Sequence, residues 1–211
     1  MISTPELTVC QVDGKNLSIK SNFKNIEKQY FLQKLSACSF YLEYGAGEST
    51  LLASSEPNIK TIRSIETTSK WIKIVNENIT YSNKDVNIDY IDINSDENNW
   101  GYPKNKNKID NWSLYQQYCY GKNYDLCFID GRFRVSSFLH TYINAPLGCN
   151  ILIHDYPNKN SGRTYYKDIE KIAIKKEQIE SLAVFVKSED LSENNLLKAK
   201  HIIHNHFSDP R

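Results

Sequence analysis

The sequence predicts an α/β fold: a three-layer sandwich in which helices cover both faces of a mostly parallel sheet of six or seven strands. Two observations support this. Short runs rich in β-branched and aromatic residues alternate with segments whose apolar residues recur at helical spacing, without internal repeats or a long linker. The 211 residues are also enough for one domain with a sizeable core. We therefore expect residues 1–211 to form a single domain.

The β-rich runs are bounded by turn residues and predict six strands. These are residues 39–43, 59–66, 86–93, 124–130, 150–154 and 182–187. The run 124–130 is almost continuously apolar, as is typical of a central parallel strand. A further strand around 199–203 is an alternative to a terminal helix at 193–207, because the periodicity does not decide between them.

The expected helices follow the spacing of the apolar residues. The clearest lies at 135–143, where apolar residues stand at positions i, i+3, i+4, i+7 and i+8. The other predicted helices are an N-terminal helix at 24–37 and helices at about 49–55, 68–79, 165–173 and 193–207.

Residues 94–122 break the alternation of strands and helices. The stretch is polar and rich in turn residues, and aromatic residues follow. A connection of this length inside a compact domain usually covers or binds a ligand. We interpret it as a lid insertion, in which Trp100, Tyr102 and Tyr115 offer aromatic faces to a sugar ring or an aromatic acceptor.

Composition restricts the partners and the location of the protein. With 26 basic and 25 acidic residues the net charge is +1, which gives no electrostatic reason to expect nucleic acid as a partner. No apolar run approaches the roughly 18–20 residues of a membrane span, and no signal peptide is visible. The five cysteines are widely spaced and form no CxxC pair, which favours reduced thiols. These features predict a cytoplasmic protein.

Carboxylates collect where the expected parallel strands end. They are Glu43, Glu66, Asp92, Asp130 and, beside His154, Asp155. Ligands of open parallel sheets bind beyond the carboxyl ends of the strands, where the strand order reverses. The sequence therefore predicts a ligand site at this edge of the sheet.

The first strand leads into the turn Gly45-Ala46-Gly47. Glycines permit a tight turn and close approach of a nucleotide-like ligand to the backbone. The dinucleotide fingerprint would place a third glycine where Thr50 stands, so a diphosphate ligand is disfavoured. A carboxylate at Glu43 suits a ligand with an amino-acid end and a positive centre, such as S-adenosylmethionine (SAM). Glu66, 19 residues after Gly47, can accept both ribose hydroxyls.

Four blocks of the sequence resemble class I SAM-dependent methyltransferases. They are YLEYGAGEST at 41–50, SIE at 64–66 followed by Trp71, DLCFIDGRFRV at 125–135, and IHDY at 153–156 followed by Arg163 and Tyr165-Tyr166. The blocks are most similar to a subgroup with the patterns LEYGSGGST, SVE…W, VDGRFRV and HDY…R…Y. The last two also resemble, more distantly, plant glucuronoxylan 4-O-methyltransferases. Glu48 and Thr67-Thr68 depart from the subgroup pattern.

This resemblance implies a Rossmann-like fold and SAM as the cofactor, over about residues 39–170. It places the ribose at Glu66, the adenine near Asp92 and the transferred methyl next to Asp130. The cofactor-binding residues it implies are Glu43, Gly45, Ala46, Gly47, Ser49, Thr50, Glu66, Trp71, Asp92, Asp130 and Gly131.

Methyl transfer to a hydroxyl requires alignment, exclusion of water and removal of a proton. Asp155, His154 and Asp130 are the catalytic candidates. His154 and Asp155 are the candidates for the base, with Asp130 close by, and histidine titrates near neutral pH. Alternatively, Asp130 and Asp155 hold Mg²⁺ or Mn²⁺, as the carboxylates of catechol-type O-methyltransferases do. In that family a third ligand is an Asn, which Tyr156 replaces here.

The candidates for binding the acceptor are Arg132, Tyr102, Tyr156, Arg163 and Tyr166. Guanidinium groups bind an acidic sugar or a phosphate bidentately, although Arg132 could equally pair with Asp130 or Asp155. The sequence thus predicts a SAM-dependent O-methyltransferase acting on a hydroxyl of a sugar or glycan-type acceptor. The alternatives are a metal-assisted O-methyltransferase of a phenolic or other small molecule, and an NAD(P)-dependent oxidoreductase or silent nucleotide-binding module. The oligomeric state is not indicated.

Overall fold

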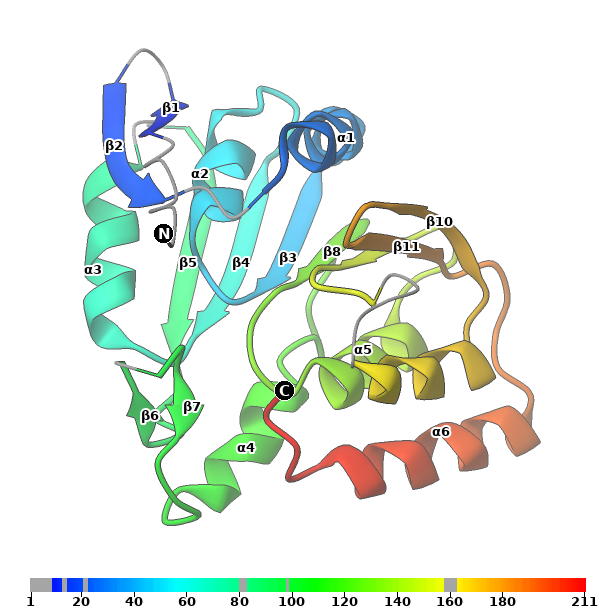
Figure 1. Cartoon of the computed structure of the whole chain (residues 1–211). Coiled ribbons are helices and arrows are strands. Elements are labelled where there is room, and N and C mark those ends of the chain that lie inside the picture. Colours follow the sequence, from blue (N-terminus) through cyan, green and yellow to red (C-terminus); the bar gives the residue numbers. More distant parts are fainter. Residues whose placement is uncertain (1–8, 13–14, 21–22, 80–82, 98, 158–162) are drawn as a thin grey trace, which may run out of the picture.

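Seven strands form the central sheet, in the order β10-β11-β9-β8-β3-β4-β5 (Figure 1). They are β3 (Phe40–Tyr44), β4 (Thr61–Glu66), β5 (Asp85–Tyr90), β8 (Leu126–Ile129), β9 (Asn150–Ile153), β10 (Lys175–Ile179) and β11 (Leu182–Val186). Strands β5, β4, β3, β8 and β9 run parallel, and β11 is antiparallel to β9 and β10. The predicted Rossmann-like, mostly parallel sheet is therefore confirmed. This computed structural model describes residues 9–12, 15–20, 23–79, 83–97, 99–157 and 163–211.

Helices cover both faces of the sheet (Figure 1). They are α1 (Asn25–Ser36), α2 (Glu48–Ser55), α3 (Ser69–Asn78), α4 (Ile109–Gln116), α5 (Arg134–Asn144), α6 (Glu193–His206) and the 3₁₀ helix η1 (Thr164–Lys171). Helices α1, α2 and α3 pack side by side as one layer, and α5 packs against α4, α6 and η1 in the other. The segment at 193–207 is therefore a helix and not the alternative strand.

Alternation along the strands divides the core into two parts. Successive side chains of a strand point to opposite faces, so Tyr41 packs with Phe31 of α1 whereas Leu42 packs with Phe138 of α5. Every residue of β8 is buried, as expected for a central parallel strand. The sheet thus holds the carboxyl ends of its parallel strands at one edge, between the two helical layers.

Several elements differ from the expectations. The hairpin β1 (Val9–Val12) and β2 (Lys15–Lys20) and the edge strand β10 were not expected. The predicted helix at 165–173 is the 3₁₀ helix η1, whose three-residue period places its buried residues Tyr166 and Ile169 on one side. The third strand ends at Tyr90, so Asp92 lies in the following loop.

The expected lid at 94–122 is partly core. It contains the short strands β6 (Ser95–Asp96) and β7 (Tyr102–Pro103) and the helix α4. Trp112 and Tyr115 of α4 are buried, and their rings contact Phe133 at centroid distances of 5.2 and 6.0 Å. Tyr115 is therefore a core residue and not part of a lid. Trp100, in contrast, is 77% exposed.

Two other expectations can be compared with the structure. None of the helices in the described ranges is long and apolar enough to cross a membrane. Of the five cysteines, four are buried free thiols, and they are Cys38, Cys119, Cys127 and Cys149.

Candidate active site

The strand order reverses between β3 and β8, because the sheet continues from β3 to β4 and β5 on one side and from β8 to β9 on the other. The turns that follow these two strands meet backbone to backbone. Gly45 has a φ of +90°, and a Cβ there would lie 2.9 Å from Cα and N of Gly131. A Cβ on Gly131 would lie 1.9 Å from Oη of Tyr115. Only glycine fits either position, so the reversal point is built from bare backbone.

Glu43 orders the glycine turn from within the core. Its carboxylate is completely buried, and burial raises its pKa while hydroxyl donors oppose that shift. The donors are the hydroxyls of Tyr41, Ser49, Thr50 and Ser64. A carboxylate has about four lone-pair sites, so these donors fill it. The predicted contact of Glu43 with the methionine end of SAM stays a prediction.

Glu66 holds the glycine turn from the neighbouring strand β4. Its Oε1 accepts from the backbone N–H groups of Thr67 (2.6 Å) and Thr68 (3.0 Å), and its Oε2 accepts from that of Ala46 (3.1 Å). Trp71 Nε1 donates to the carbonyl of Ala46. The structure thus brings Glu66, Ala46 and Trp71 together, as the four-block pattern predicts.

Asp92 lies in the loop after β5, next to Ile91, whose backbone N–H donates to the carbonyl of Glu66 at 3.0 Å. It accepts from the backbone N–H of Asn94 at 2.8 Å and pairs with Lys108 at 3.4 Å. Its predicted role near adenine stays a prediction.

Arg134 joins the ends of β8 and β9. Its guanidinium donates four hydrogen bonds, to the carbonyls of Gly131 (2.9 Å), His154 (2.8 Å) and Asp130 (3.0 Å) and to Oδ2 of Asp155 (3.0 Å). Its Nη2 also forms an ion pair with Oδ1 of Asp130 at 2.9 Å. Arg134 is 4% exposed, so it is a buried cation with two carboxylate partners. It is not among the residues that the sequence predicts for the site.

His154 lies between two carboxylates. Its Nδ1 is 3.2 Å from Oδ1 of Asp130, and its Nε2 is 3.7 Å from Oε2 of Glu27 on α1, the distance of an ion pair without a hydrogen bond. Burial alone would lower the pKa of His154, but Asp130, Glu27 and Asp155 raise it to about 10. The imidazole is therefore protonated at neutral pH. The flanking carboxylates stabilise its charged form, which disfavours His154 as a base at neutral pH, and its catalytic role stays a prediction.

The ligand atoms of Asp130, His154 and Asp155 lie within 4.8 Å of one another, a spacing that a metal ion could use. The charges do not fit one. Arg134 already pairs with both carboxylates and would repel a divalent cation beside them, and His154 would have to lose its proton to become a ligand. The alternative in which Asp130 and Asp155 hold Mg²⁺ or Mn²⁺ is thus not supported by these contacts.

Asp155 connects this charged cluster to an open pocket. It has a φ of +57°, a left-handed conformation that is uncommon for a non-glycine residue and often found at functional sites. Burial would raise its pKa, but Arg134 and Arg163 lower it to about 2. The Arg163 contact to Oδ2 is 2.8 Å. Asp155 is therefore ionised at neutral pH.

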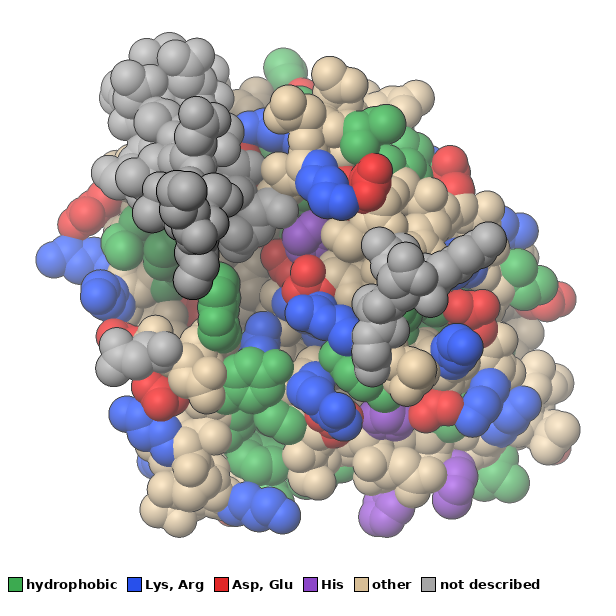
Figure 2. Space-filling model, viewed as in Figure 1, with side chains coloured by type: hydrophobic (Ala, Val, Ile, Leu, Met, Phe, Trp, Pro, Cys, Tyr) green, Lys and Arg blue, Asp and Glu red, His purple; other side chains and the backbone are tan. Residues whose placement is uncertain are grey.

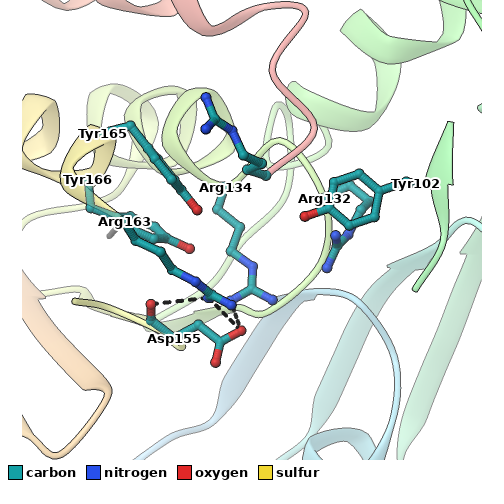
Figure 3. A pocket seen from close by; sticks show the side chains of 8 residues that line it. Tyr102, Arg132, Arg134, Asp155, Arg163, Tyr165 and Tyr166 are labelled. Atoms are coloured by element: carbon teal, nitrogen blue, oxygen red, sulfur yellow. Dashed lines mark hydrogen bonds and ion pairs between the residues drawn. The ribbon is translucent and has the colours of Figure 1, made fainter. Parts of the chain in front are cut away.

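The pocket beside Asp155 has a volume of about 230 Å³ (Figure 3). It is lined by Tyr102, Arg132, Arg134, Asp155, Arg163, Tyr165, Tyr166 and Arg211. Figure 2 shows basic side chains gathered in the middle of this face of the molecule, with acidic and hydrophobic side chains among them. The predicted acceptor residues Arg132, Tyr102, Arg163 and Tyr166 thus lie around one pocket.

Tyr156 does not line this pocket. Its side chain is 2% exposed, and its hydroxyl donates to Oε1 of Glu170 at 2.6 Å. The expectation that it contacts the acceptor is therefore wrong. Its ring packs in the core against Phe185 of β11, at a centroid distance of 5.9 Å.

Arg211 reaches the pocket because the last residues fold over the start of α5. The backbone N–H of Phe133 donates to the carbonyl of Pro210 (3.2 Å), and that of Arg134 donates to the carbonyl of Arg211 (3.1 Å). The guanidinium of Arg211 lies 4.5 Å above the ring of Tyr165. No sequence signal placed Arg211 at the site, because the segment lies outside the four blocks.

Comparisons with known proteins agree with this arrangement at the level of the fold. No family model and no curated protein matches the sequence. Among solved structures, a methyltransferase-like protein from Silicibacter pomeroyi DSS-3 matches with a TM-score of 0.75 and 23% identity, over 91% of this chain and 98% of that one. The N-methyltransferase NodS from Bradyrhizobium japonicum WM9 matches with a TM-score of 0.51 and 14% identity, over 80% and 100%. The chain therefore has the fold of class I methyltransferases.

Proposed function

We propose that the protein is a SAM-dependent O-methyltransferase that methylates a hydroxyl of a sugar or glycan-type acceptor. The observation that carries the proposal is the junction of Gly45 and Gly131 at the reversal point of a methyltransferase fold, directly beside a polar pocket that ends in an ionised carboxylate. Gly45 and Gly47 of this turn are partly exposed, so a cofactor can approach their backbone. The pocket offers charged, hydroxyl and aromatic groups suited to a small polar acceptor.

On this proposal the glycine turn holds the methionine end of SAM and Glu66 holds the ribose. Thr50 supports a ligand other than a dinucleotide, because its Oγ1 accepts from the N–H of Gly47 at 2.8 Å and its side chain fills the position where a diphosphate fingerprint needs glycine. The NAD(P) alternative is thereby weakened. The metal-assisted alternative is weakened by Arg134, which already bridges Asp130 and Asp155.

Asp155 is the group best suited to take the acceptor proton. Both guanidinium contacts use its Oδ2, and within the described part of the chain Oδ1 has no hydrogen-bond partner. Bound SAM would supply an electrophilic methyl group, and its sulfur would take up the leaving electron pair. The hydroxyl proton of the acceptor would become strongly acidic as the oxygen gains the methyl group. A carboxylate with a pKa of about 2 can then accept it.

His154 and Arg134 act on this reaction through the carboxylates. Arg134 joins Asp130 and Asp155, and protonated His154 contacts the same Oδ1 of Asp130 that Arg134 contacts. Both are positioning residues, which hold the proton acceptor in one orientation.

The test is transfer of a labelled methyl group from SAM to a panel of sugars, oligosaccharides and phenols, with product identification by mass spectrometry. The proposal expects O-methylated sugar. The Asp168→Asn variant is the matched control, because Asp168 pairs with Lys171 and His206 away from the pocket. Methylation of phenols only, or activity that requires an added divalent cation, would contradict the proposed acceptor or mechanism.

A further inference from the structure

The pocket beside Asp155 has more positive than negative charge. Four of its lining residues are arginines, and Asp155 is its one acidic lining residue. Because Arg134 pairs with Asp155 and Asp130, the local carboxylates are already neutralised from the protein side. The remaining guanidinium groups therefore decide the charge that a ligand meets.

Arg132 is the least satisfied of these cations. It follows β8, and its guanidinium lies 4.5 Å above the ring of Tyr102. In the described ranges of the chain no carboxylate pairs with it, so neither ion pair considered from the sequence is formed. A half-buried guanidinium with only an aromatic face as its partner keeps its donors for a ligand.

Arg163 and Arg211 each use only some of their guanidinium N–H donors for the contacts seen within the described residues. Arg163 contacts Asp155 through a single terminal nitrogen, Nη1, which leaves its Nε and Nη2 donors. Arg211 binds Asp209 through Nε and Nη2 at 2.8 Å each, which leaves Nη1. Together with Arg132, these side chains come from three separate segments and meet at one pocket (Figure 3).

Tyr166 gives an independent indication of a missing partner. Its side chain is completely buried and lines the pocket, and its hydroxyl has no hydrogen-bond partner among the residues that the structure describes. Arg134, which lines the same pocket, donates hydrogen bonds to Gly131, His154, Asp130 and Asp155. A buried hydroxyl without a partner is costly, and a ligand oxygen would satisfy it.

We propose that Arg132, Arg163, Arg211 and Tyr166 bind an oxyanion group, a carboxylate or a phosphate, carried by the methyl acceptor. This inference rests on the proposed function, since it specifies the acceptor of the same site. Guanidinium forks and a hydroxyl are the donors that such a group requires. At about 230 Å³ the pocket is smaller than the roughly 300–1,000 Å³ of drug-sized ligand sites, so it suits one anionic sugar unit and not a long segment of polymer.

The experiment is calorimetric titration of the whole chain, saturated with S-adenosylhomocysteine (SAH), with inorganic phosphate, a hexose phosphate, a hexuronate and the matching neutral hexose. The anionic ligands should bind at least about tenfold more tightly than the hexose, with an affinity that falls as salt is added. A preference for the hexuronate would identify a carboxylate, and a preference for the hexose phosphate would identify a phosphate. Equal affinity for the hexose and both anions would overturn the proposal.

Two variants test the named donors. Arg132→Gln should weaken binding of the preferred anion by about tenfold and leave SAH affinity unchanged. Arg63→Gln is the control and should change neither affinity, because Arg63 on β4 pairs with Asp85 on β5. Tyr166→Phe should weaken binding of the anion without lowering the melting temperature, because the hydroxyl that it removes has no hydrogen-bond partner among the described residues. A lower melting temperature with unchanged anion affinity would show that the hydroxyl is structural. Failure of SAH to bind would refute the proposed function, whereas SAH binding without anion binding would refute only this inference.

Discussion

The charge state of His154 can be tested without any knowledge of the acceptor. The side chain is 5% exposed and lies between Asp130 and Glu27, and its pKa is raised from 6.5 to about 10. Because the folded-state pKa exceeds the unfolded-state value, the protonated imidazole stabilises the fold fully below pH 6.5. That stabilisation is lost as the pH rises through 10.

The size of the effect follows from the shift. Each pKa unit corresponds to about 1.36 kcal/mol, so the contribution of His154 is at most about 5 kcal/mol. Loss of one member of a buried ion pair typically costs about 3–5 kcal/mol, which is the same range. The free energy of unfolding should fall by several kcal/mol between pH 6.5 and 10, with a slope of at most about 1.4 kcal/mol per pH unit from this group.

The assay is urea unfolding of the wild type and of His154→Gln at a series of pH values. The difference in unfolding free energy between them should shrink as the pH rises from 6.5 to 10. His140→Gln is the matched control: His140 is also buried, but burial lowers its pKa to about 4, so its contribution changes only below pH 6.5. If His154→Gln does not fold, Glu27→Gln removes one carboxylate and should reduce the same slope. A difference that is constant over this range would refute the protonated imidazole.

Three further predictions follow. Gly131→Ala should lower the free energy of unfolding by about 1–3 kcal/mol more than Gly121→Ala in urea unfolding, because only the first Cβ meets neighbouring atoms. Glu43→Gln should cost about 1–3 kcal/mol in the same assay and weaken SAH binding, because an amide nitrogen cannot accept from the hydroxyls that now bind the carboxylate. Asp155→Asn should reduce turnover by at least about 100-fold with little change in SAH affinity. In the wild type, Asp155 should stay ionised and support turnover until the pH falls close to its pKa of about 2.

Burial explains which elements could be predicted from the sequence. Strand β8 and helix α5 are packed on nearly all sides, so their apolar patterns are complete. Strand β10 lies at the edge of the sheet and has the polar sequence KKEQI, which cannot be told from a loop. An aromatic side chain in a polar connection fits a ligand site or a core equally well. Only the docking of α4 against Phe133 shows that Tyr115 belongs to the core.

The sequence predicted the site residues that stand at the ends of strands. It did not predict the charged residues from other elements that contact them. The rule for parallel sheets correctly brings Asp130 and Asp155 together. Arg134 stands four residues after Asp130, but the chain between them is not helical, so this spacing alone does not predict the ion pair. Glu27 had no sequence signal either, because α1 is distant in the sequence from His154 and outside the four blocks. The pKa of His154 therefore could not be inferred from residue type alone.

The most direct test of the proposed function is calorimetric titration of the purified chain with SAH and, separately, with NAD and NADP. The proposal predicts one SAH bound per chain and no heat from the dinucleotides, with SAH affinity reduced in Glu66→Gln because Glu66 is assigned to the ribose. Binding of NAD or NADP in the absence of SAH binding would contradict it.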